Sequence, residues 1–173
     1  MLKKNSWIYK VFLLTFFLSI LFSTITNLIA YHTNLLVIFI SLILVIVVGI
    51  VFDMLGTASL TCKEAYFHSM SAQKIKGARE AISVLKNNVR FANICNDVIG
   101  DVCGIVSGGL GSVLAVSLSK VSSVSLTILS VILAAFISAF TVGGKAVFKG
   151  VAIKNCNQII FAFGKLKSLF HVK

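Results

Sequence analysis

Four long apolar blocks constrain what this chain of 173 residues can fold into. They cover residues 11–30, 35–58, 94–118 and 123–144. About 20 residues of α-helix cross the hydrocarbon core of a bilayer, and a helix satisfies its own backbone hydrogen bonds there. No small-residue cleavage site follows the first block, so we interpret it as a span rather than a signal peptide. The sequence therefore predicts one all-α integral membrane domain, residues 1–173, with four transmembrane helices.

The basic residues predict how these helices are oriented. The chain carries 16 Lys and Arg against 5 Asp and Glu, a net charge of +11. All the basic residues except Lys120 lie in the N-terminal segment, in the middle segment 61–90 or in the tail from residue 145. By the positive-inside rule, both termini and the middle segment lie in the cytoplasm. This distribution favours a multi-pass protein of the cell membrane, with the lipid bilayer as partner and no nucleic acid.

Two polar segments have helical patterns of their own. In the middle segment, Ile75, Ala78, Ile82 and Leu85 recur at spacings of three and four, which predicts a cytoplasmic helical hairpin between the second and third spans. The tail predicts an amphipathic helix lying at the membrane interface and held partly by anionic lipid. Its apolar face consists of Ala152, Cys156, Ile159, Phe163, Leu166 and Phe170.

Three of the five acidic residues, Asp53, Asp97 and Asp101, fall within the predicted spans. A charge there costs several kcal/mol, so such residues usually face a partner, a water-filled cavity or an ion path. Their neighbours carry hard oxygen donors, which suit Mg²⁺ or Na⁺ better than soft metals. The sequence thus predicts a metal site drawn from the following residues: Asp53, Thr57, Asn96, Asp97, Gly100 and Asp101.

Glycines recur every four residues in the third block, at Gly100, Gly104 and Gly108. Small residues at this spacing let helix backbones approach closely. We expect this glycine ladder to pack helices together and to form the interface of a homodimer.

Simpler interpretations of the same residues remain open. Asp53 and Lys145 both lie near the inner membrane edge and could form a structural ion pair, and Asp97 could reach water at the inner leaflet. The four cysteines and three histidines show no metal-ligand spacing, which favours buried thiols and surface imidazoles. No nucleophile, base and orienting group occur together, so an enzyme is not expected.

The order of these motifs resembles the transmembrane domain of the CorB/CorC and CNNM (cyclin M) magnesium transporters. The resemblance covers about residues 48–170, leaving 1–47 as an extra helix and the start of the second span. "FDMLGTA" matches the family's Phe-Ser-Gly-Ser-Glu-Thr-Ala motif at Phe52, Thr57 and Ala58, with Asp53 for a serine and Gly56 for the glutamate.

Two further motifs carry the resemblance. "CNDVIG" matches Gly-Asn-x-x-x-Asn at Asn96, with Gly100 in place of the second asparagine. "KAVFKGVAIKN" matches Glu-x-x-Pro-Lys-x-x-Ala-x-x-Asn at Lys149, Ala152 and Asn155, with Lys145 in place of the glutamate. The family's cytoplasmic CBS domains have no counterpart in these 173 residues.

The resemblance implies a transporter of a hard divalent cation, Mg²⁺ or Co²⁺, working by alternating access. The alternative is a non-transporting membrane scaffold or accessory subunit, in which Lys145 occupies the cation position. In the transporter, Lys145 is expected to modulate the cation site.

Overall fold

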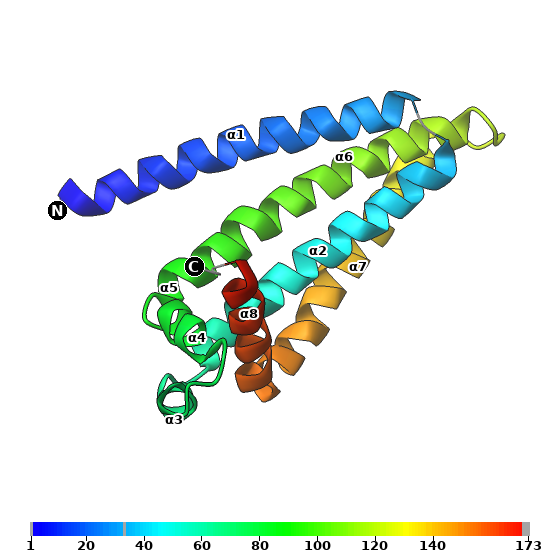
Figure 1. Ribbon diagram of the computed structural model, residues 1–173. Coiled ribbons are helices and arrows are strands. Elements are labelled where there is room, and N and C mark those ends of the chain that lie inside the picture. The colour runs from blue at the N-terminus through cyan, green and yellow to red at the C-terminus, as the bar shows by residue number, and fades with distance from the viewer. Residues whose placement is uncertain (1, 33, 171–173) are drawn as a thin grey trace. The chain divides into compact units, whose positions relative to one another are not determined.

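The computed structural model describes residues 2–32 and 34–170, and it describes side chains from residue 9 onward except those of 27, 29–33 and 170. The described residues form helices and connecting turns, with no strand among them. The helices are α1 (Leu2–His32), α2 (Leu35–Thr61), α3 (Ala65–Ala72), α4 (Ala78–Leu85), α5 (Asn88–Asn93), the π-helix η1 (Ile94–Ile99), α6 (Gly100–Ser119), α7 (Leu126–Lys154) and α8 (Cys156–Phe170) (Figure 1).

Four stretches are long and apolar enough to cross a membrane: Tyr9–Thr26, Leu35–Thr61, Asn88–Ser119 and Leu126–Lys154. This confirms the expectation of an all-α chain with four helices able to span a bilayer. The last three run over 27, 32 and 29 residues, more than the roughly 20 that a bilayer requires. Part of each helix can therefore lie outside the hydrocarbon core.

The chain divides into two compact units, and the division cuts these three helices. The first unit holds Met1–Gly49 and Val98–Gly144, and the second holds Ile50–Asp97 and Lys145–Lys173. Of the three aspartates expected to share a site, Asp53 and Asp97 belong to the second unit and Asp101 to the first.

In the first unit, α1 runs beside α6 (Figure 1). The core joins Ile38 and Leu42 of α2 to a row on α6, against which Leu133 and Ile137 of α7 pack. That row consists of Val102, Val106, Leu110 and Leu114. Gly111 allows the close approach of α7, because a Cβ there would overlap the Ile137 side chain.

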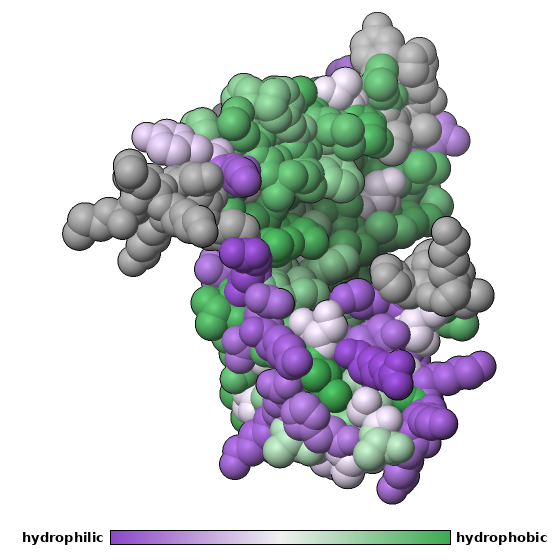
Figure 2. Space-filling view, turned by 60° about the vertical axis from the view of Figure 1, so that its left-hand side comes forward, coloured by the Kyte–Doolittle hydropathy of each residue, from purple (hydrophilic) through white to green (hydrophobic). Residues whose placement is uncertain are grey.

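The outward faces of the first unit are apolar. Phe12 on α1 and Phe140 on α7 are each 68% exposed, and many other large apolar side chains are exposed with them. Figure 2 shows such residues gathered in one broad region of the face it draws, with hydrophilic residues gathered in another. Apolar surface on this scale marks contact with lipid or a partner rather than with water.

The second unit has a core built where short helices meet the ends of α2 and α7. Fully buried Phe67 of α3 and Ile160 of α8 pack with Ala58, Cys62, Ala81, Leu85 and Ala152. The middle segment contains α3 and α4, and α4 buries Ala78, Ala81, Val84 and Leu85. The predicted apolar stripe is wrong at Ile75, which lies in the turn between the two helices and is exposed. Its membrane side and its role as a cytoplasmic hairpin stay predictions.

The tail differs from the single helix that was expected. α7 continues through Lys154 and α8 begins at Cys156, so Ala152 belongs to α7 and the rest of the expected apolar face to α8. The apolar residues around 146–153 extend the span before Asn155 separates the two helices.

Some expectations concern residues that the structure does not describe. The side chains of Lys3, Lys4, His32 and Phe170, and residues 171–173, lie outside the described part of the chain.

Candidate functional site

Asp53 is the one aspartate of the three whose side chain is buried, at 4% relative exposure. It lies on α2, in the second unit. Lys149 of α7 places its Nζ 3.5 Å from Asp53 Oδ2. That oxygen accepts no hydrogen bond from any described group, so the ammonium compensates the charge at ion-pair distance only.

The ion pair differs from the one weighed from the sequence. Among the described residues, the lysine that pairs with Asp53 is Lys149, and Lys145 is a half-buried residue one helical turn earlier. Four residues make about one turn of α-helix, so both lysines share a face of α7. The side chain of Lys149 is 48% exposed, so its ammonium can leave Asp53 and be solvated by water instead.

Asn96 packs against the backbone of α2 at Gly56. A Cβ at Gly56 would overlap Asn96 Oδ1 and lie 2.7 Å from its Cγ. The Asn96 Oδ1 atom is buried and has no hydrogen-bond partner among the described residues. The absence of a side chain at Gly56 therefore allows the Asn96 amide to pack against the backbone of α2.

Asn96 lies inside the π-helix η1, Ile94–Ile99, which joins α5 to α6. A π-helical turn inserts an extra residue into a helix and is often found at functional sites. Here the π-helical turn carries Asn96, whose amide packs on Gly56. The sequence pattern gave no sign of this turn.

Gly56 lies three residues after Asp53 and Thr57 lies four after it, so all three share a face of α2. Asn96 Oδ1 therefore reaches the helix face that carries the Asp53 carboxylate and the Thr57 hydroxyl. Thr57 Oγ1 donates to the Asp53 carbonyl oxygen at 2.9 Å, which leaves its lone pairs as acceptors. Fully buried Ser59 donates to the Gly56 carbonyl at 2.7 Å.

The remaining candidate residues have other surroundings. Asp97 and Asp101 are exposed and Gly100 is buried. Across the described ranges, no three His, Cys, Asp or Glu residues lie close enough together to hold a metal ion. Asn96 Oδ1 packs on Gly56 of α2, the helix that carries Asp53 and Thr57 one turn apart.

The glycine ladder is open on one side within the first unit. Cβ atoms at Gly104 and Gly108 would meet no atom within 4 Å. Both glycines line a cavity of about 230 Å³ between α6 and α7, with Ser112, Ser130 and Ser138.

A thiol pair in the second unit was not identified as such from the sequence. Cys62 Sγ donates to Asn157 Oδ1 at 2.9 Å, and Cys156 Sγ lies 3.8 Å from the same oxygen. Burial, reinforced by the neighbouring Cys156 thiol, raises the pKa of Cys62 from 9.0 to about 12. Cys62 is buried, as the sequence led us to expect, whereas Cys156 is half-buried.

The chain matches no protein-family model, no curated protein and no solved structure. The likeness to the CorB/CorC and CNNM transporters thus rests on the motifs quoted above.

Proposed function

We propose that this protein binds a hard divalent cation, Mg²⁺ or Co²⁺, at Asp53, Thr57 and Asn96, and moves it across the membrane. The observation that carries the proposal is a pair of buried oxygens, Asp53 Oδ2 and Asn96 Oδ1, neither of which accepts a hydrogen bond from a described group. Buried oxygens of this kind are costly unless a partner satisfies them. Carboxylate, amide and hydroxyl oxygens are the ligands that Mg²⁺ prefers.

Lys149 has a defined part in this proposal. A half-exposed lysine can leave Asp53 when a divalent cation arrives and return when it departs, keeping the carboxylate compensated in both states. Lys145, one turn away on the same helix, adds positive charge and modulates the affinity.

A second candidate function is favoured by the same ion pair. In a non-transporting scaffold or accessory subunit, the Lys149 ammonium takes the cation position permanently, in the place that the sequence suggested for Lys145. The two functions differ in one respect: only the transporter exchanges the ammonium for a metal ion.

The proposal includes a homodimer in the cell membrane with both termini in the cytoplasm. Its interface is the open side of the glycine ladder at Gly104 and Gly108, where a second helix has room to approach.

The test is uptake of Mg²⁺ and Co²⁺ into proteoliposomes by the full chain. We expect flux from the unaltered protein, loss of at least about tenfold in Asp53→Asn and Asn96→Ala, and unchanged flux in Glu80→Gln, whose carboxylate lies on α4. Absence of flux in every protein would favour the scaffold. Equal flux in all of them would remove Asp53 and Asn96 from the mechanism.

A further inference from the structure

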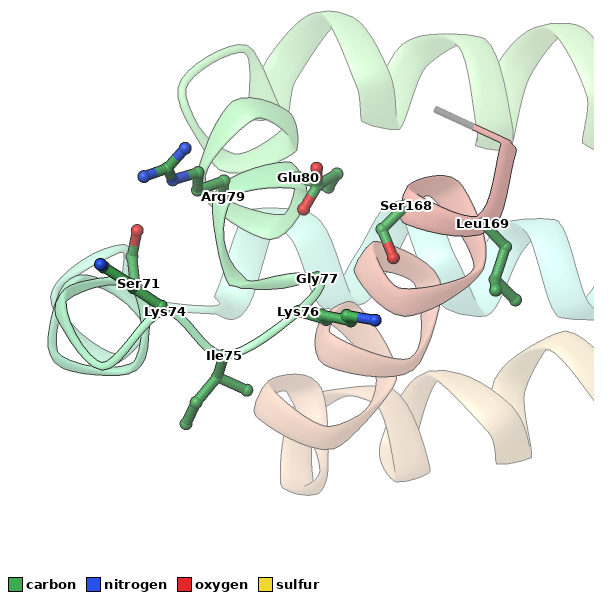
Figure 3. Close-up of a pocket in the computed structure, with 9 residues that line it drawn as sticks. All are labelled: Ser71, Lys74, Ile75, Lys76, Gly77, Arg79, Glu80, Ser168 and Leu169. Carbon is green, nitrogen blue, oxygen red and sulfur yellow. The ribbon is translucent and has the colours of Figure 1, made fainter. Parts of the chain in front are cut away.

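The second unit contains a basic cavity that the proposed cation site does not use. Its volume is about 430 Å³, within the range of small-molecule sites. It lies where the α3–α4 connection and the start of α4 meet the end of α8. Figure 3 shows the side chains that line it.

Three cations line this cavity: Lys74, Lys76 and Arg79. One carboxylate, Glu80, lies with them, so the lining carries a net charge of +2. The Arg79 and Lys74 side chains extend to the same side as Ser71, and Lys76 extends toward α8 (Figure 3). A group that accepts from guanidinium, ammonium and hydroxyl at once is an oxyanion such as phosphate.

The start of α4 adds positive electrostatic character to the same place. α4 begins at Ala78, whose N–H already donates to the Ile75 carbonyl oxygen. The partial positive charge of a helix N-terminus favours a nearby anion. Gly77 (φ 92°) and Lys74 (φ 57°) both adopt the left-handed region, which turns the chain so that the cationic side chains and the start of α4 border one cavity.

Two apolar side chains also line the cavity. Ile75 is 36% exposed and Leu169 is 71% exposed. Such residues beside lysine and arginine are the arrangement with which interfacial proteins bind lipid, the apolar groups entering the acyl boundary and the cations meeting the headgroups. A freely diffusing phosphate would gain nothing from Ile75 and Leu169.

We propose that this cavity binds the phosphate of an anionic phospholipid headgroup through Lys74 and Arg79, with Lys76 adding positive charge from the α8 side and with Ile75 and Leu169 against the acyl chains. The Glu80 carboxylate repels the phosphate and therefore lowers the affinity of the cavity for the lipid. The site is independent of cation transport, because it uses no residue of the Asp53 site.

The experiment uses the full chain in detergent micelles and native mass spectrometry. Phosphatidylglycerol is titrated against zwitterionic phosphatidylcholine, with inorganic phosphate as a competitor. Phosphatidylglycerol should be retained more strongly than phosphatidylcholine. The triple variant Lys74→Gln, Lys76→Gln, Arg79→Gln should bind it at least about tenfold more weakly, while Glu80→Gln should bind it more tightly.

The matched control removes the same charge outside the cavity, with Lys63→Gln, Lys86→Gln and Lys154→Gln, all exposed. The affinity of this control variant for phosphatidylglycerol should stay within about twofold of the affinity of the unaltered protein. Equal losses in the two triple variants would overturn the site, because general electrostatic attraction would then explain the binding. Equal retention of phosphatidylcholine would overturn it as well.

A further pair of substitutions distinguishes a lipid from free phosphate. Inorganic phosphate should displace phosphatidylglycerol only incompletely from the unaltered protein. Ile75→Ser with Leu169→Ser should weaken binding of the lipid and make its displacement by inorganic phosphate easier. If this variant binds the lipid like the unaltered protein, and inorganic phosphate displaces the lipid fully from both, the ligand is a soluble phosphate and the lipid assignment is wrong. Thermal melting of each variant checks that the unit still folds.

Discussion

The side-chain amide of Asn96 lies against the bare backbone of Gly56, where a Cβ would overlap its oxygen. This contact joins the π-helix η1 to α2 and directs a buried oxygen onto the face that carries Asp53. The candidate cation site depends on that contact.

Replacing Gly56 with alanine should disrupt the site. The added Cβ forces the Asn96 amide out of its position, and overpacking of this kind costs about 1–3 kcal/mol. Thermal or denaturant unfolding in detergent measures this cost. The control is Gly150→Ala in the same unit, where a Cβ meets nothing within 4 Å; an equal effect in both variants would show that the Asn96 contact is unimportant.

Removing the Lys149 ammonium should lower the stability of the folded protein and raise its affinity for divalent cations. Lys149→Gln leaves the Asp53 carboxylate buried without its counter-charge, but since Lys149 is half exposed the loss should be about 1 kcal/mol rather than the several expected of a fully buried pair. Addition of Mg²⁺ should restore the melting temperature of this variant. Lys154→Gln on the same helix should show neither effect.

The packing of α4 on α8 should depend on two glycines. A Cβ at Gly164 would overlap the Gly77 carbonyl oxygen, and one at Gly77 would lie 2.7 Å from the Lys165 nitrogen. Because backbone cannot move aside as a side chain does, Gly164→Ala should destabilise the protein by about 1–3 kcal/mol. Wild-type stability in this variant, measured by chemical denaturation, would mean that α4 and α8 do not pack so closely.

The Cys62 thiol should resist alkylation until the protein unfolds. A pKa of about 12 in the folded state, against 9.0 ordinarily, lowers the thiolate fraction at pH 8 by about a thousandfold. Peptide-resolved mass spectrometry after iodoacetamide treatment compares folded and denatured protein, and similar labelling rates in the two would contradict the burial.

The same shift predicts how stability varies with pH. The folded state holds the Cys62 proton more tightly than the unfolded state, so this contribution is complete below about pH 9 and is lost as the pH rises toward 12. Cys62→Ala should reduce that dependence.

The apolar blocks were sufficient to predict the fold class. Hydrophobic length alone determines whether a helix can cross a bilayer, and the four predicted blocks correspond to the four candidate spans. The ends of the helices were predicted less well. α7 continues to Lys154 because a helix can carry lysines beyond the hydrocarbon, so a change in polarity there does not end the helix.

The candidate site could be predicted only in part. Asp53, Thr57 and Asn96 stood out because polar groups are rare in apolar blocks, and Asn96 packs on Gly56, one turn from Asp53 on α2. Their surroundings could not be deduced, since the π-helical turn at Ile94–Ile99 and the choice of Lys149 over Lys145 depend on how helices from distant parts of the chain meet. The cavity at Lys74, Lys76 and Arg79 was missed because these cations, although close in sequence, border a cavity only once the end of α8 packs beside the α3–α4 connection.

The central claim, that Asp53 and Asn96 hold a hard divalent cation, is tested most directly by binding of Mn²⁺, a paramagnetic substitute for Mg²⁺ that also prefers oxygen ligands. Electron paramagnetic resonance of the purified full chain should detect one bound Mn²⁺ that Mg²⁺ displaces, weaker binding in Asn96→Ala and Asp53→Asn, and tighter binding in Lys149→Gln. Bound Mn²⁺ that is unchanged in all three variants, or no bound Mn²⁺ even in Lys149→Gln, would contradict it.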